Sequence, residues 1–280
     1  MATSRLHSVF WTASSLYTCG LNVGQLGYQR APDAACERAP RPVAGLLGKS
    51  VQLVHCTELV SLVVARDADT PLLYLLYRFA CRKLNVHRSR LEHLRRVCVV
   101  GGALDAGSSG ASSAISSSLP SDLLAALRPG APLAILLLTD TGTLLFALVP
   151  DSGPLELRAL RYSIGRSLRL VDISAHARGL HLLTSSGELY SCKLPASALP
   201  SSQAQSQSTS IPAASTTTSS ATQQRTSTET SAPPVVHQHQ HQQSELLDLN
   251  RVPNAHRAVA VFANSVGSEF CILQNLPNAW

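Results

Sequence analysis

The sequence predicts an all-β fold, most simply a β-propeller built from repeated hairpins. Four segments share one theme: an apolar strand, a polar turn of small residues, and a second strand that contains an aromatic residue. Three of the four follow a further short apolar strand, and helical periodicity is weak along the chain. A β-sandwich with ordinary hairpins is the alternative. The repeated segments are 7–21, 60–76, 133–148 and 179–194.

Apolar runs and alternating patterns predict the strands, and glycine with polar residues predicts the turns between them. In the 133–148 hairpin, Asp140-Thr141-Gly142 supplies a turn in which the glycine can adopt a positive φ. Ser185-Ser186-Gly187 has the same composition in the 179–194 hairpin. The one helical segment expected is 119–127, with Ser121 as its N-cap. In chain order, strands are expected at 51–56, 59–65, 72–77, 95–100, 134–138, 144–149, 171–174, 179–184, 188–193, 258–263 and 269–273.

Two low-complexity segments interrupt this pattern. Of the fifty residues 196–245, 29 are Ser, Thr or Gln, and residues 107–122 include eight serines. Such segments cannot bury enough apolar area to offset the entropy of ordering, so we expect both to be disordered. About 214 residues remain, enough for roughly four blades, which predicts an incomplete propeller with exposed edge strands and a fragment of a longer protein. The predicted organisation is blades at 1–106 and 123–195 and the last strands at 246–280.

Composition argues against membrane and secreted classes. The most apolar stretch, 131–149, is interrupted by Thr139–Thr143, and the N-terminus lacks the apolar region of a signal peptide. The seven cysteines are an odd number, widely spaced and without a CxxC pair. They predict reduced thiols in an intracellular protein, cytoplasmic with the nucleus as the alternative.

Three motifs that could carry chemistry lack the context that their chemistry needs. The glycine-rich segment 20–27 precedes residues that read as a loop, whereas dinucleotide binding needs a helix there. The segment 45–50 resembles the end of a phosphate-binding loop, but a strand follows it, so no helix N-terminus can face a phosphate. His237, His239 and His241 alternate without a nearby thiol or carboxylate to complete a metal site. We therefore predict no enzyme, no cofactor and no metal site.

The net charge of +6 is concentrated in the window Arg78–Arg96, which holds seven Lys or Arg residues against Glu92. The window is either a surface for an acidic protein partner or a solvated strand end and loop. Nucleic acid is not expected, because no aromatic residues are interleaved to stack on bases. The candidate partner-binding residues are Arg88, Arg90, Arg95 and Arg96, together with exposed residues around Asn22 and Gln25.

The segment 19–27, CGLNVGQLG, resembles the hallmark turn of the repeats named for the regulator of chromosome condensation. The usual form is Trp-Gly, then Asn, then Gly-Gln-Leu-Gly; here Cys19 replaces the tryptophan, and the loop is one residue shorter. The resemblance implies a propeller of four-stranded blades, in which glycines permit a tight turn and the leucine fills the space between blades. The residues of this structural turn are Gly20, Asn22, Gly24, Gln25, Leu26 and Gly27.

Longer segments at 10–28, 72–84, 97–105 and, most specifically, 251–277 resemble the inhibitor of Bruton tyrosine kinase family. The resemblance implies a non-enzymatic interaction module that binds and restrains a Tec-type tyrosine kinase, and that serves as substrate adaptor of a cullin ubiquitin ligase. The ankyrin repeats and BTB domains of that family are not recognised in this sequence. Guanine-nucleotide exchange on a small GTPase and chromatin binding stay open as alternatives.

Overall fold

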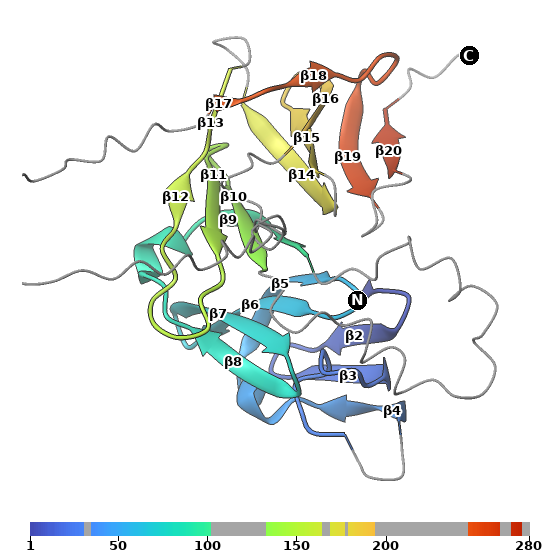
Figure 1. The fold of residues 1–280 in the computed structure, drawn as a ribbon, viewed down its shortest axis with the longest axis vertical. Coiled ribbons are helices and arrows are strands. Elements are labelled where there is room, and N and C mark those ends of the chain that lie inside the picture. Colours follow the sequence, from blue (N-terminus) through green and yellow to red (C-terminus); the bar gives the residue numbers. More distant parts are fainter. Residues whose placement is uncertain are drawn as a thin grey trace, which may run out of the picture. The chain divides into compact units, whose positions relative to one another are not determined.

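The computed structural model describes residues 1–30, 35–101, 133–163, 169–176, 179–193, 246–263 and 270–275, and they fold almost entirely into β-strands (Figure 1). All of them belong to one compact unit. The predicted all-β fold is confirmed. The predicted helix at 119–127, both low-complexity segments and the alternating histidines lie outside the described residues.

Within these residues, four antiparallel sheets of four strands follow one another in chain order. Sheet 1 contains β1 (Ala2–Thr3), β2 (His7–Trp11), β3 (Leu16–Leu21) and β4 (Cys36–Pro42). Sheet 2 contains β5 (Ser50–Cys56), β6 (Ser61–Asp67), β7 (Thr70–Tyr77) and β8 (Ala80–Leu84). Sheet 3 contains β9 (Leu94–Val100), β10 (Ala134–Thr139), β11 (Leu144–Leu148) and β12 (Arg158–Ala159). Sheet 4 contains β14 (Leu170–His176), β15 (Gly179–Thr184), β16 (Leu189–Cys192) and β18 (Asn250–Arg251).

Two smaller sheets and two short helical turns complete the described elements. Sheet 5 is the antiparallel pair β19 (Ala258–Ala263) and β20 (Phe270–Gln274). A short parallel pair joins β13 (Arg161–Tyr162) to β17 (Leu246–Leu247). The 3-10 turns are η1 (Ala44–Leu46) and η2 (Arg88–Arg90).

The polar turns predicted from glycine form as expected. Leu138 pairs with Leu144, and Gly142 in the connecting loop has a φ of +88°. The Thr139 hydroxyl accepts a hydrogen bond from the Thr143 amide at 2.9 Å, which closes the loop. Gly187 has a φ of +80° in the β15–β16 turn. Local turn chemistry therefore favours these two hairpins.

One segment that the sequence indicated as a loop forms a strand. Residues 36–42 are β4, the outer strand of sheet 1, although Pro40 and Pro42 lie within it. An edge strand tolerates proline because one row of its backbone groups faces away from the sheet. A register shift opposite Thr18 and Gly20 accommodates the irregular pairing.

Apolar side chains fill the space between each sheet and the next. Four clusters of buried residues each join two successive sheets, so the sheets pack face to face in chain order, as propeller blades do. Their largest members are fully buried leucines and isoleucine: Leu16 and Leu76 between sheets 1 and 2, Leu62 and Ile135 between sheets 2 and 3, Leu136 and Leu182 between sheets 3 and 4, and Leu183 and Leu189 facing sheet 5.

Two edge strands, β9 and β19, are hydrogen-bonded along their unpaired edges to side chains of the preceding sheet. The Val99 amide in β9 donates to Nδ1 of His55 in β5 at 3.2 Å. The Val261 amide in β19 donates to Asp172 at 3.2 Å, and the Ala263 amide donates to Ser174 at 2.8 Å, both acceptors being in β14. These bonds satisfy backbone donors that strand pairing leaves open, and they couple one sheet to the next.

Candidate functional site

The repeat turn 20–27 is a buried connection rather than an exposed loop. Asn22 is 4% exposed, and Gln25 and Leu26 are 0% exposed. The Gln25 side chain donates to the Leu21 carbonyl at 2.7 Å and accepts from the Val23 amide at 3.0 Å. Asn22 accepts from the Gly24 amide and donates to the Tyr28 carbonyl. Both amide side chains are therefore buried and hydrogen-bonded within the turn, so they are not accessible to a partner.

The glycines of this turn are required by positive φ and by contact with the neighbouring sheet. Gly24 has a φ of +118°, and a Cβ atom on it would lie 3.2 Å from the Arg78 backbone. The Phe79 amide donates to the Gly24 carbonyl at 2.8 Å, which docks the β7–β8 hairpin on the turn. Gly27 approaches Leu76 in the same way, at 2.9 Å for a built Cβ. The turn therefore fastens sheet 1 to sheet 2.

A serine–histidine chain lies next to this turn. The His7 ring is 2.7 Å from the Ser61 hydroxyl through Nε2 and 2.8 Å from the Ser4 hydroxyl through Nδ1. Ser61 also donates to the Gln25 carbonyl at 3.3 Å. Burial lowers the pKa of His7 to about 4, and Ser61 is 0% exposed. A hydroxyl with no path to solvent cannot attack a substrate, so this arrangement joins the sheets rather than serving as a nucleophile and base.

Three cations of the basic window are engaged within the protein. Arg82 donates to the backbone carbonyls of Pro150 and Asp151 at 3.0 and 2.8 Å. Arg78 is 3.8 Å from the Asp151 carboxylate. Arg82 therefore ties the β7–β8 hairpin of sheet 2 to the loop that follows β11 in sheet 3, whereas the pair of Arg78 with Asp151 is loose because both side chains are exposed.

Arg96 makes the strongest of these contacts. Its Nε is 2.6 Å from Oδ1 of Asp172, and its Nη2 is 2.9 Å from Oδ2, so the pair is bidentate. The hydrogen bond to Asp172 raises the pKa of Arg96 further above its ordinary value. Asp172 also accepts from the Ile173 and Val261 amides and is 5% exposed. No local sequence pattern indicates this pair, because Arg96 precedes Asp172 by 76 residues. We therefore exclude Arg96 from the surface candidates.

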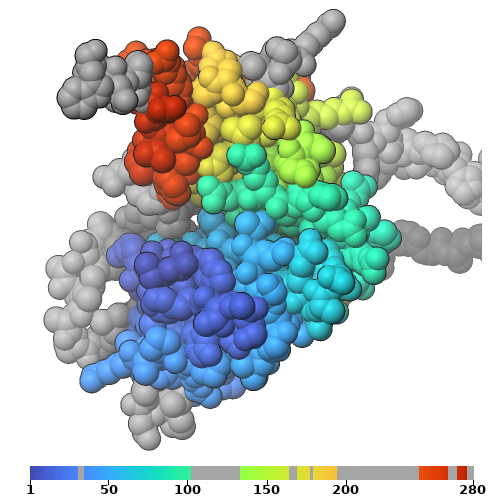
Figure 2. All heavy atoms as spheres, turned by 180° about the vertical axis from the view of Figure 1, so that it is seen from behind, coloured from blue at the N-terminus to red at the C-terminus, as the bar shows by residue number. Residues whose placement is uncertain are grey.

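The remaining cations of the window face solvent. Arg88 and Arg90 lie on η2, Arg95 on β9 and Lys83 on β8, and all four are exposed. Arg88 is 3.9 Å from Glu92, a loose pair between exposed groups. Within the described residues, no acidic group pairs with the other three. We call these four side chains the basic surface, and Figure 2 shows the cyan-to-green part of the chain that carries them at the face of the molecule.

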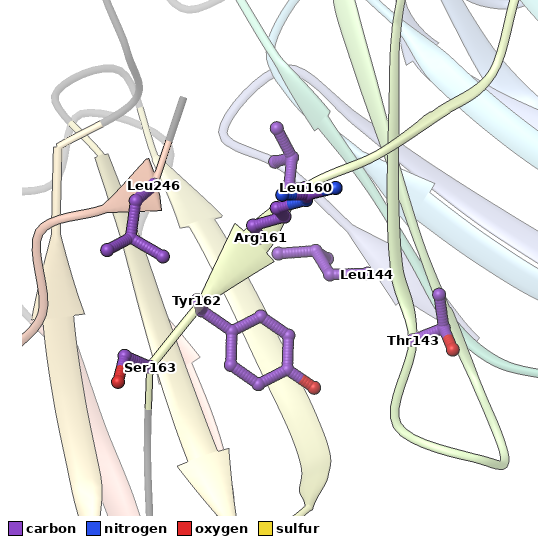
Figure 3. Close-up of a pocket in the computed structure, with 7 residues that line it drawn as sticks. All are labelled: Thr143, Leu144, Leu160, Arg161, Tyr162, Ser163 and Leu246. Atoms are coloured by element: carbon purple, nitrogen blue, oxygen red, sulfur yellow. The ribbon is translucent and has the colours of Figure 1, made fainter. Parts of the chain in front are cut away.

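An open hollow of about 560 Å³ lies where the β13–β17 pair meets the β11 end of sheet 3 (Figure 3). Leucines line one part, and Thr143, Arg161 and Ser163 line another. The Tyr162 hydroxyl donates to the Gly142 carbonyl at 2.5 Å and fixes the wall. The described lining contains no carboxylate, imidazole or thiol, so it provides no strong general base.

The thiols and the ligand-type residues give no metal or redox centre in the part of the chain that the structure describes. All seven cysteines are free, and only Cys36 and Cys271 are exposed. Burial raises the pKa of Cys56, Cys98 and Cys192 to about 12, which keeps them as inert thiols. No group of three His, Cys, Asp or Glu residues is placed to hold a metal ion within the described ranges. Among these residues there is also no helix long and apolar enough to span a membrane.

Comparison with known proteins gives relatives along nearly the whole chain, although no family model matches. The chain is 25% identical over 280 residues to the inhibitor of Bruton tyrosine kinase of Xenopus laevis, and 26% identical over 289 residues to that of Mus musculus. Each match covers 99% of this chain but only 17% and 18% of the relatives' own length. The human protein of the same name is 37% identical over 112 residues, which is 38% of this chain and 8% of that protein. The resemblance that the sequence predicted is confirmed.

Solved structures that align with part of this chain include human WBSCR16 and yeast RCC1 (Prp20) bound to Kap60. WBSCR16 is 16% identical and has a TM-score of 0.44, covering 68% of this chain and 46% of its own. Prp20 is 14% identical with a TM-score of 0.40, covering 70% of this chain and 43% of its own. The chain is similar in sequence to proteins named inhibitor of Bruton tyrosine kinase, and its described residues form four successive four-stranded antiparallel sheets of the kind found in propeller blades.

Proposed function

We propose that this chain is a non-enzymatic protein-interaction module that binds and restrains a Tec-type tyrosine kinase. The observation that carries the proposal is the similarity, over 99% of the chain, to proteins named inhibitor of Bruton tyrosine kinase. The buried pair of His7 and Ser61 fits this role, because Ser61 has no exposed surface and the pair joins two sheets. We place the interaction in the cytoplasm, where the seven free cysteines stay reduced.

The contact surface that we propose is the basic surface. Lys83, Arg90 and Arg95 are exposed and make no ion pair within the described residues, so their charge is available to a partner. Exposed cations steer an acidic surface into contact and raise the association rate more than the final affinity. The proposed kinase surface is therefore acidic, and binding weakens as salt screens the charges.

The test is a binding assay between this chain and a purified Tec-type kinase, by calorimetry or surface plasmon resonance, at two salt concentrations. The test variant changes Arg88, Arg90 and Arg95 to Glu. The matched control changes three other exposed arginines without ion pairs among the described residues, namely Arg5, Arg38 and Arg169, to Glu. Both variants have the same net charge, so a difference in affinity between them reports where the charges lie and not how many there are.

We expect the test variant to lose at least about tenfold in affinity, since several charge pairs of roughly 0.5 kcal/mol each are reversed in sign. The control variant should retain most of the affinity. Equal binding by both variants refutes the basic surface as the contact. Absence of binding by the unmodified chain refutes the kinase proposal itself.

A further inference from the structure

The outer face of sheet 5 carries large apolar side chains that no described residue covers. Val259, Phe262 and Leu273 are 52%, 51% and 59% exposed. None of them belongs to an apolar cluster of the described core, whereas Val261 on the opposite face is 1% exposed and packs against sheet 4. The two strands of this sheet, β19 and β20, are drawn in red beside sheet 4 in Figure 1.

Strand register places these side chains together on one face. Phe262 pairs with Cys271, and Ala260 pairs with Leu273, and directly paired residues project to the same side of a sheet. The register shift between Ala258 and Ala260 brings Val259 to this side as well. The result is one continuous apolar face across both strands.

A covering sheet is expected there because sheets 2, 3 and 4 each lie between two apolar clusters. Each of the four apolar clusters lies between two successive sheets, and their members are almost completely buried. A two-stranded sheet is only marginally stable by itself, and an exposed cluster of Phe, Leu and Val marks an interaction surface. The side chains of this face are apolar, as are those of the faces that lie between two sheets.

The face also favours a copy of itself as its occupant. β19 and β20 contain no Asp, Glu, Lys, Arg or His, although the whole chain carries a net charge of +6. Two copies can therefore meet here without burying a charge or bringing like charges together. Large and small residues alternate, since Phe262 and Leu273 flank Ala260 and Cys271, so that across a two-fold axis large side chains can fill the space above small ones.

We propose that this face of sheet 5 is a self-association surface through which two copies of the chain pack sheet against sheet. The contact is isologous, with Phe262 and Leu273 at its centre. It is separate from the basic surface of sheets 2 and 3, so it holds whether or not the kinase proposal does. The interface is dry and apolar, and it is therefore insensitive to salt.

The test is sedimentation velocity on the full chain over roughly 1 to 100 µM, with the unmodified protein and three single variants. Phe262→Asp and Leu273→Asp each place a charge on the proposed face. Leu47→Asp is the control, because Leu47 is 52% exposed but lies next to η1, away from sheet 5. The side chains are at least half exposed, so each variant retains its far-UV circular dichroism spectrum.

We expect a dimer for the unmodified chain and for Leu47→Asp, and a dissociation constant raised on the order of 10- to 100-fold for the two sheet 5 variants. A monomer at every concentration overturns the proposal. A dimer that the two sheet 5 variants leave unchanged, or that Leu47→Asp weakens equally, also overturns it.

Discussion

Replacing Asp172 with Ala removes the acceptor that joins three sheets, and we expect it to lower the free energy of unfolding. The carboxylate receives the Arg96 guanidinium from sheet 3, the Val261 amide from sheet 5 and the Ile173 amide of its own strand. Because Asp172 is 5% exposed, water does not take its place. The variant therefore leaves a cation and a buried amide without their partner.

The magnitude follows from these contacts. A buried amide donor that loses its acceptor costs about 1–3 kcal/mol. The Arg96 side chain is 37% exposed, so solvent screens the pair, and we count roughly 1 kcal/mol for it. The total is about 2–4 kcal/mol, which lowers the melting temperature by roughly 4–16 °C for a domain of this size.

Urea and thermal denaturation followed by circular dichroism measure this loss. Asp140→Ala is the matched control, because Asp140 is exposed and its contact with His93 at 3.5 Å joins two exposed side chains. The control should change stability by less than about 0.5 kcal/mol. Hydrogen exchange at the Val261 amide should accelerate only in Asp172→Ala. A loss below about 0.5 kcal/mol for Asp172→Ala refutes the coupling of the sheets through this carboxylate.

Three more predictions follow from buried groups. Gly24→Ala should lower the free energy of unfolding, measured in urea, by about 2 kcal/mol or more, because Gly24 has a φ of +118° and contacts the Arg78 backbone. Gly48 has a φ of +74° but open space around it, so the control Gly48→Ala should lower the free energy of unfolding by only about 1 kcal/mol. Burial lowers the pKa of His7 from 6.5 to about 4, so the unfolded chain binds a proton that the folded chain rejects, and the urea midpoint should fall as pH falls from about 6.5 to 4. The free energy of unfolding should fall by about 3 kcal/mol over this pH range. The fall should be smaller in His7→Gln, and an equal pH dependence of the two proteins would contradict the prediction. Ellman's reagent should titrate two thiols in the folded protein and the rest only in denaturant; the two are Cys36 and Cys271.

Part of the candidate site was predictable from the sequence, and part was not. The exposure of Arg88, Arg90 and Arg95 fits the basic window, and whether they bind a partner stays a prediction. Arg96 could not be separated from them by sequence, since its neighbour Arg95 has the same charge and the same strand. Alternation in β9 turns the two side chains to opposite faces, and only one of those faces meets Asp172.

The sequence by itself determined most of the hairpin strands, the polar turns and the repeat turn, because these depend on residues close together in the chain; it did not predict β4, whose segment it indicated as a loop. Glycine at a positive φ, β-branched runs and alternation act within a few residues, and they predicted the hairpins that the structure shows. Only the tertiary structure decided which polar side chains form hydrogen bonds between the sheets. Arg82 is hydrogen-bonded to Pro150, 68 residues further along the chain, and His7 to Ser61, 54 residues further along. No local sequence pattern predicts such pairs. It also decided that no described residue covers the outer face of sheet 5, because burial depends on what packs against a strand and not on the strand's own residues.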